Sequence, residues 1–284
     1  MPQVVDNYIA LFADDAKLFS VVGNDEDQEK LQEDIDKLQE WSNEWQLRFN
    51  AKKCKVMHLG RKNLTLKYNM GEVELEEITH EKDLGVMIDQ ELKFDIHVER
   101  QVNKANSQLG LIRRSFDALE PETFTMLFKS LVRTHLEYCN AVTYPIFAKQ
   151  RILLEGVQRR ATKLLPGLED LPYPERLKRL KLPSLQYRRT RGDVIEVYKY
   201  VHNIYKVKEL PVEIDDNPAS TRGHCFKLRK PRCKKTATQK FFRHRVVDIW
   251  NRLPEDIVNA PTLNTMKNRL DEHWKKYLYA TEPF

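Results

Sequence analysis

The sequence predicts an α+β fold in which short strands and one helix come first and further helices follow. Residues 8–13 and 16–22 are apolar runs of strand length, and such runs are typical of buried strands. From residue 96 onward the apolar positions recur every three or four residues, which is the period of a helix buried along one side. The length of 284 residues is enough for one large domain or two modest ones.

The first 95 residues are expected to hold a hairpin, an amphipathic helix and several short strands. The hairpin joins the two apolar runs, and the polar residues 24–27 that follow suit a helix N-terminus. The helix has an apolar stripe that we expect to pack on the sheet of the hairpin: Leu31, Ile35, Leu38, Trp41 and Trp45. Further strands are predicted at residues 55–59, 64–68, 73–75 and 84–88, the second and third forming a hairpin around Met70-Gly71.

Residues 96–284 are expected to be mainly helical. The first helix is marked by the stripe Val98, Val102, Ala105, Leu109 and Ile112, and Pro121 suits the first turn of the next helix. Further helices are predicted at about residues 153–165, 185–201, 241–251 and 263–277, with a loop at 167–174 and a linker at 211–218.

Charge is distributed unevenly along the chain, whose net charge is +6. Residues 1–100 hold 13 Lys and Arg against 22 Asp and Glu, a balance of −9, whereas residues 101–284 hold 35 against 20, a balance of +15. Phosphates release condensed counterions when protein cations neutralise them. A basic half of this size therefore favours nucleic acid as a partner over a solvated surface with a basic bias.

The sequence shows no membrane-spanning run, no signal peptide and no closely spaced pair of cysteines. No apolar run is long enough to span a membrane, and residues 1–7 lack the basic and apolar regions of a signal peptide. We expect an intracellular protein, in the nucleus or the cytoplasm, with no membrane partner. The four cysteines include no CxxC pair and are expected to be reduced.

Two adjacent carboxylates, Asp14 and Asp15, lie between the two apolar runs of the hairpin. A buried carboxylate is costly unless it is paired or holds a metal ion, and oxygen ligands favour Mg²⁺ or Mn²⁺. The pair therefore indicates a cation site at the apex of a buried hairpin. The alternative is an ordinary type I′ turn, because Asp is common in turns.

Several motifs, in the same order, resemble those of reverse transcriptases from non-LTR (LINE-type, jockey-like) retrotransposons. Phe12-Ala13-Asp14-Asp15 resembles their FADD box, residues 41–57 resemble the next palm motif, and residues 82–97 resemble the primer-grip hairpin. The likeness continues at residues 128–144, 158–161, 221–224, 245–254 and 267–271, so that it covers nearly the whole chain.

The resemblance implies an RNA-directed DNA polymerase made of a palm and a thumb. Residues 1–95 would be a partial palm, residues 96–210 a helical thumb-like domain, and residues 211–284 a basic C-terminal segment with helices. In the intact enzyme two Mg²⁺ (or Mn²⁺) ions, held in part by Asp14 and Asp15, would catalyse nucleotidyl transfer.

The resemblance also gives roles to residues near the carboxylate pair. Phe12 and Ala13 would line the primer terminus, Asn50 and Lys53 would lie close to the nucleotide, and Leu84 and Gly85 would belong to the primer grip. Each has an ordinary alternative: Phe12 as a core aromatic residue, Lys53 in a basic turn before a strand, and Gly85 at a bulge.

One part of the family pattern has no counterpart in the sequence. The fingers and the first half of the palm carry another metal-binding Asp, whereas Asp6, the only acid before the FADD box, lies on the same hairpin. We therefore expect a polymerase fragment that is inactive as these 284 residues, holds no cation tightly and exposes its apolar hairpin. The alternatives are a catalytically dead nucleic-acid-binding protein built on the thumb, and an unrelated metal-dependent phosphotransferase built around Asp14 and Asp15.

Basic residues recur on the predicted thumb helices. The resemblance implies that they contact the backbone of an RNA template, an RNA–DNA hybrid or DNA. For one helix alone a solvated basic face is the alternative, and the bias shared by several helices favours binding. The residues are Arg100, Lys104, Arg113, Arg114, Arg151, Arg159, Arg160 and Lys163, followed by Arg188, Arg189 and Arg191.

A zinc site is not expected in the C-terminal segment. His224, Cys225, Cys233 and His244 are spaced too widely and irregularly for the paired ligands of structural zinc. The basic run at residues 227–235 suits nucleic-acid binding or a nuclear localisation signal.

Overall fold

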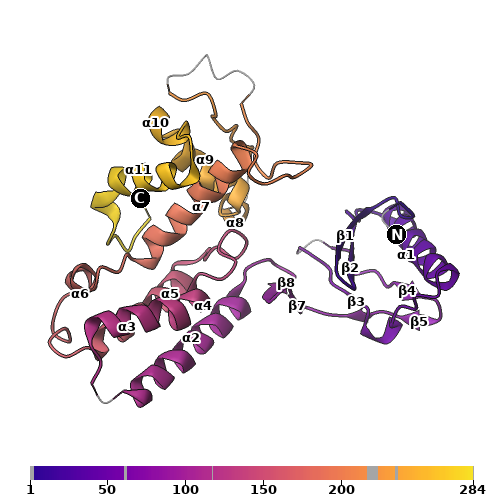
Figure 1. The fold of residues 1–284 in the computed structure, drawn as a ribbon. Helices are drawn as coiled ribbons and strands as arrows, with labels where there is room; N and C mark the ends of the chain where they lie inside the picture. The colour runs from indigo at the N-terminus through magenta and orange to yellow at the C-terminus, as the bar shows by residue number, and fades with distance from the viewer. Residues whose placement is uncertain (1–2, 61–62, 117, 216–222, 234–235, 284) are drawn as a thin grey trace. The chain divides into compact units, whose positions relative to one another are not determined.

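The computed structural model describes residues 3–60, 63–116, 118–215, 223–233 and 236–283 (Figure 1). These residues form a mixed α+β structure of helices and small sheets with short strands, so the α+β class is confirmed. The chain divides into two compact units, residues 1–93 and residues 94–284. Every strand of the described residues lies in the first unit.

Four two-stranded sheets make up the strand part of the first unit. Three are antiparallel pairs: β1 (Tyr8–Phe12) with β2 (Asp15–Phe19), β4 (Asn69–Met70) with β5 (Val73–Glu74), and β7 (His80–Asp83) with β8 (Val86–Asp89). The fourth sheet pairs β3 (Lys55–Val56) in parallel with β6 (Glu76–Glu77). The strand predicted at 55–59 is therefore only two residues long in the structure. Within the described residues no strand joins two of these sheets, so β1 and β2 each keep one unpaired edge.

Two other predicted strands differ from the structure. The strand predicted at residues 84–88 begins two residues later, because Leu84 (φ 44°) and Gly85 (φ 85°) form the turn between β7 and β8. Residues 64–68 form no strand, since Thr65 has a φ of 51°, which interrupts an extended run. β4 and β5 make the hairpin at Gly71 instead.

Helix α1 (Asp25–Glu44) packs one side on a small core. Asn24 caps the helix, because its side-chain oxygen accepts a hydrogen bond from the Asp27 N–H at 2.9 Å. The buried Ile35 forms this core with Tyr68 and Met70, and Leu18 of β2 packs against it. The helix thus packs mainly on β4 and on Tyr68 before it, and the hairpin reaches this core through Leu18. Trp45, predicted on the buried stripe, is 62% exposed because the helix ends one residue before it.

Asp34 is a fully buried carboxylate of α1 that the sequence did not single out. It accepts hydrogen bonds from the backbone N–H groups of Asp6 (3.0 Å) and Asn7 (2.8 Å), and Lys37 pairs with it at 3.2 Å. Burial raises the pKa of this carboxyl, but the hydrogen bonds from Asp6, Asn7 and Lys37 outweigh burial and hold its pKa below the ordinary value.

Replacing Asp34 with alanine is expected to destabilise the first unit by about 2–4 kcal/mol, because two backbone N–H groups lose a charged acceptor. The lowered pKa also means that the carboxylate contributes stability above its unfolded pKa of about 3.9, and that this contribution is lost as the pH falls through the folded value. Hydrogen exchange of the α1 amides, with the exposed Asp36→Ala as control, measures the first effect, and urea unfolding at falling pH measures the second. Unchanged exchange protection in the Asp34 variant would contradict this account.

The second unit is helical throughout its regular structure. Its elements are α2 (Asp95–Ser115), α3 (Pro121–Leu127), the π-helix η2 (Phe128–Val132), α4 (Arg133–Leu136), α5 (Ala148–Ala161), η3 (Thr162–Leu164), α6 (Tyr173–Leu180), α7 (Leu185–Val201), α8 (Thr236–Gln239), α9 (Phe242–Asn251), α10 (Glu255–Val258), α11 (Leu263–His273) and η5 (Lys275–Tyr277). Each predicted helix is present, but the one predicted at 153–165 begins at Ala148, and α11 ends at His273 before the short turn η5. Helices α6, α8 and α10 are additions, and α6 begins inside the loop predicted at 167–174.

Two hydrophobic clusters fill the second unit, and α7 contributes to both. The first cluster joins α2 to α6 and includes Leu185 at the start of α7. The second cluster packs the rest of α7 against α9, α10 and α11, with Trp250 and Leu270 fully buried (Figure 1). The second cluster contains residues on both sides of 210, so the boundary predicted there does not divide the hydrophobic core.

Candidate functional site

The Asp14–Asp15 pair lies at the exposed end of the β1–β2 hairpin. Phe12 pairs with Asp15, Ala13 has a φ of 53°, and Asp14 completes the turn. All four residues are exposed, Phe12 at 58%. The buried hairpin that the apolar runs alone predict is therefore wrong, whereas the exposed apolar hairpin expected of a polymerase fragment agrees with these exposures. The hairpin is exposed because its sheet has only two strands. Leu18 is the hairpin residue that packs against the small core of the first unit.

The side chains around this turn do not fit a resident Mg²⁺ or Mn²⁺ ion. Asp15 and Lys17 lie on the same face of β2, and Lys17 forms an ion pair with Asp83 at the end of β7. Among the described residues no group of three or more His, Cys, Asp or Glu side chains lies close enough to hold a metal ion. Two exposed carboxylates leave most positions of an octahedral ion to water.

The other residues of the predicted polymerase site lie on separate elements of the first unit. Asn50 precedes the 3₁₀ turn η1 (Ala51–Lys53), and its carbonyl accepts a hydrogen bond from the Lys53 N–H at 2.8 Å. Leu84 and Gly85 form the β7–β8 turn, next to the Asp83 that pairs with Lys17. For the described part of the chain, no hydrogen bond or ion pair joins Asn50 or Lys53 to the Asp14–Asp15 turn.

Residues 1–284 are expected not to extend a primer on an RNA template with Mg²⁺ or Mn²⁺. Nucleotidyl transfer needs carboxylates that hold two ions, and this turn offers two exposed acids. The measurement is gel-based primer extension, with the Asp14→Ala, Asp15→Ala double variant as control. Extension by the wild type that the double variant lacks would contradict this expectation.

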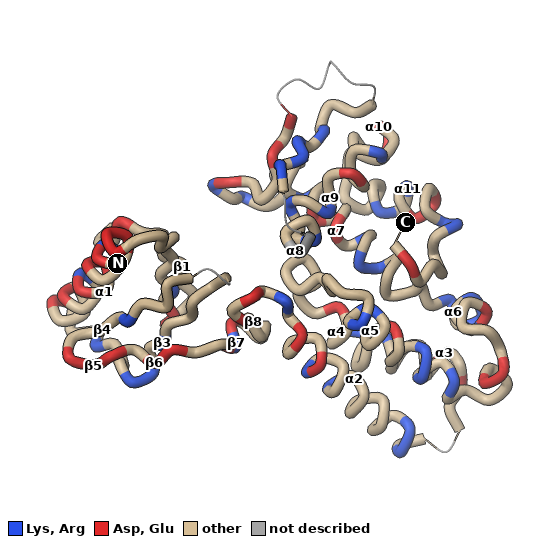
Figure 2. Tube along the Cα trace, turned by 180° about the vertical axis from the view of Figure 1, so that it is seen from behind, with Lys and Arg blue, Asp and Glu red and all other residues tan. Residues whose placement is uncertain are grey.

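Helix α2 carries a line of basic residues on its solvent side. Arg100, Lys104 and Arg114 lie at positions i, i+4 and i+14, which share one side of a helix, and all three are exposed. The opposite side of α2 is buried in the first cluster. Arg113 is also exposed, at the same end as Arg114. Figure 2 shows basic residues along α2 and acidic residues along α1.

Helix α5 packs beside α2 and adds further exposed cations. Arg160 joins the two helices, because its guanidinium donates a hydrogen bond to the Asn106 side chain at 3.0 Å. Arg159 lies over the ring of Tyr173 at 5.0 Å, and Lys163 of η3 is exposed. Arg151, predicted with this group, is half-buried. We call the exposed cations of the two helices the α2–α5 basic face: Arg100, Lys104, Arg113, Arg114, Arg159, Arg160 and Lys163.

The basic residues predicted on α7 are not part of such a face. Arg188 binds both carboxylate oxygens of Glu137, and Arg191 binds both oxygens of Asp271. Arg189 is buried. The expectation that these three contact nucleic acid is corrected, because they are used inside the unit. Sequence alone missed this, since the partner carboxylates lie 51 to 80 residues away.

Among the four His and Cys residues of the C-terminal segment, the adjacent His224 and Cys225 lie in different surroundings. His224 is buried, and its Nε2 lies 3.1 Å from the Trp250 carbonyl oxygen. The Cys225 thiol contacts the Asn259 side chain at 3.9 Å. In the basic run Lys230 pairs with Asp248. Residues 221–222 of the family likeness, residues 216–218 of the predicted linker and residues 234–235 of the run lie outside the described residues.

No family model, curated protein or solved structure matches this chain. Of the helices in the described ranges, none combines the length and the apolar character needed to cross a bilayer.

Proposed function

We propose that this chain belongs to a non-LTR retrotransposon reverse transcriptase and that residues 94–284 bind the phosphate backbone of nucleic acid. The observation that carries the binding proposal is the α2–α5 basic face. Its cations are exposed on two helices that pack side by side, whereas Arg188 and Arg191 of α7 are used in internal ion pairs. The reverse-transcriptase assignment is supported by the order of the motifs that begin with Phe12-Ala13-Asp14-Asp15.

The chemistry of the face suits contacts that do not depend on base sequence. Arginine and lysine bind phosphate oxygens through charge-assisted hydrogen bonds, and backbone contacts position a protein without reading sequence. The expected partners are an RNA–DNA hybrid, an RNA template or DNA. The second candidate, a nucleic-acid-binding protein without polymerase activity, is favoured by the exposed Asp14–Asp15 turn with no third ligand among the described residues.

The double variant Lys104→Gln, Arg114→Gln is expected to bind an RNA–DNA hybrid more weakly than the wild type. The control is Lys206→Gln, Lys208→Gln, which removes the same charge from exposed lysines of the same unit that lie outside the face. Fluorescence anisotropy with a labelled hybrid at about 50 mM salt measures both affinities. Equal losses in the two variants would mean that net charge, and not the face, governs binding.

A further inference from the structure

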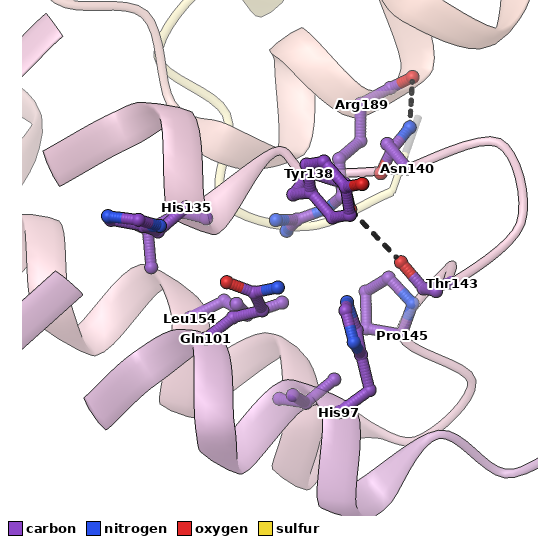
Figure 3. A pocket seen from close by; sticks show the side chains of 11 residues that line it. His97, Gln101, His135, Tyr138, Asn140, Thr143, Pro145, Leu154 and Arg189 are labelled. Carbon is purple, nitrogen blue, oxygen red and sulfur yellow. Dashed lines mark hydrogen bonds between the residues drawn. The ribbon is translucent and has the colours of Figure 1, made fainter. Parts of the chain in front are cut away.

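A small cavity inside the second unit is too small for a ligand. His97 and Gln101 of α2, His135 of α4 and Arg189 of α7 line it (Figure 3). Its volume is about 10 Å³, which is close to the least space that one water molecule needs. The β1–β2 hairpin of the first unit differs, because no other strand of the described residues covers its two edges.

The free edge of β1 presents the backbone groups of Ile9 and Leu11. The turn that joins β1 to β2 has two residues, so Phe12 and Asp15 form a hydrogen-bonded pair, and such pairs alternate along the hairpin. Every second residue of β1 counted back from Phe12 therefore bonds to β2, and Ile9 and Leu11 direct their N–H and C=O groups outward. Outside the hairpin, no backbone hydrogen bond joins these two residues to another described residue.

The sequence of β1 contains nothing that protects this edge. Natural edge strands are blocked by charged side chains, proline or a bulge, whereas Tyr8–Phe12 has no charge and no proline and pairs with β2 without a bulge. The strand β2 differs, because it carries Asp15 and Lys17, and Lys17 forms an ion pair with Asp83. The edge of β1 is therefore the better match for another apolar strand.

The side chains of β1 add an exposed apolar surface beside this edge. Tyr8 is 71% exposed, Phe12 58% and Leu11 46%. Tyr8 and Phe12 share one face of the strand, and the Tyr8 ring lies 5.8 Å from the ring of Phe19 on β2. A partner strand that is itself apolar would cover these side chains and bond to the outward backbone groups at the same time.

We propose that β1 pairs with β1 of a second copy of this chain, in an antiparallel register centred on Ala10. In this register Ile9 lies opposite Leu11 of the second copy, and each exchanges its N–H and C=O groups with the other. Tyr8 lies opposite Phe12 of the second copy on the same face, which makes an aromatic cross-strand pair. The contact is symmetric, and the uncharged strands meet without repulsion.

The proposed dimer is weak and reversible. A contact through one strand of five residues is smaller than the interfaces of about 1,200–2,000 Å² that hold stable complexes together. Association therefore depends on protein concentration. The contact lies wholly in the first unit, so it is independent of the α2–α5 basic face.

Sedimentation equilibrium of the full chain tests the proposal at about 0.5 M salt, which screens association driven by charge. The mean mass should rise above that of one chain as the concentration increases through the micromolar range. Leu11→Pro removes an N–H that β2 does not use, and this variant should remain a monomer. Ala16→Pro is the matched control on the outer edge of β2, since Ala16 pairs with Leu11, and it should associate like the wild type.

Two results of this measurement would overturn the proposal. A wild type that keeps the mass of one chain at every concentration would show that the edge serves a strand of another protein or none. Association of Leu11→Pro as strong as that of the wild type would place the contact elsewhere on the chain.

Disulfide trapping tests the register without a proline. In the proposed dimer the two Ala10 residues form a non-hydrogen-bonded pair, whose Cα atoms lie about 4.5 Å apart, within the range of a disulfide. With the four native cysteines replaced by serine, Ala10→Cys should give a covalent dimer on oxidation with diamide. Tyr8→Cys is the control, because the two Tyr8 positions do not face each other, and it should stay unlinked. Equal cross-linking of the two variants, or none of Ala10→Cys, would overturn this register.

Discussion

Replacing Arg245 with methionine is expected to lower the free energy of unfolding of the helical unit by about 3–5 kcal/mol, because it leaves a buried carboxylate without its partner. Arg245 of α9 binds Asp193 of α7 through two hydrogen bonds of 2.8 Å each. The two side chains are 7% and 3% exposed. The pair therefore joins α7 to α9 in an interior where an unpaired charge is poorly tolerated.

Arg245 also anchors the loop that precedes α5. Its guanidinium donates to the carbonyl oxygens of Asn140 (3.3 Å) and Ala141 (3.1 Å) and lies over the ring of Tyr144 at 4.3 Å. Removing it takes away these contacts as well as the ion pair. The expected loss of stability is therefore larger than that of the Asp34→Ala variant, in which one carboxylate and its hydrogen bonds are removed.

Arg243→Met is the matched control for this variant. Arg243 lies two residues away on the same helix and forms an ion pair with Glu213, but both side chains are about half exposed (51% and 49%). Exposed pairs contribute about 0–1 kcal/mol. Urea unfolding followed by circular dichroism measures both variants. A loss below about 1 kcal/mol for Arg245→Met would show that the pair does not hold α7 to α9.

The helices of the second unit were predictable because apolar residues recur every three or four positions, and these residues form the buried side of each helix. The stripe from Val98 to Ile112 forms the buried side of α2, and the helix predicted at 185–201 has the same bounds as α7. A stripe of this kind is a local property, so neighbouring residues in the sequence are enough to find it.

Polar contacts between distant residues were not predictable in the same way. The Asp34 carboxylate accepts hydrogen bonds from N–H groups 27 and 28 residues upstream, and the Asp193 carboxylate accepts them from an arginine 52 residues downstream. One signal was present: Arg189 and Asp193 fall at i+4 and i+8 from the buried Leu185, on the inner side of α7. Charged residues at such positions indicate side chains in the interior rather than a solvated face.

The prediction that the first hairpin is buried was wrong for a different reason. Apolar residues 8–22 predict strands, and β1 and β2 form. Whether a strand pair is buried depends on the elements that cover it, and a sequence run does not contain that information. Tyr8, Phe12 and Phe19 therefore lie exposed on one face of a two-stranded sheet.

Affinity for nucleic acid is expected to fall by about 100-fold when salt is raised from about 50 to 200 mM. This follows if about four cations of the α2–α5 basic face contact phosphates, since each contact contributes about 0.7–0.9 to the slope of log K against log salt. Base sequence should change affinity little, because the phosphate contacts proposed for this face do not read base edges.

The salt slope of binding, compared between the wild type and Lys104→Gln, Arg114→Gln, tests the proposed interface most directly. Anisotropy titrations of a labelled RNA–DNA hybrid at several salt concentrations give this slope. We predict a steep slope for the wild type and a slope smaller by about 1.4–1.8 for the double variant, because two phosphate contacts are lost. An unchanged slope in the double variant, or a flat slope in the wild type, would contradict nucleic-acid binding by this face.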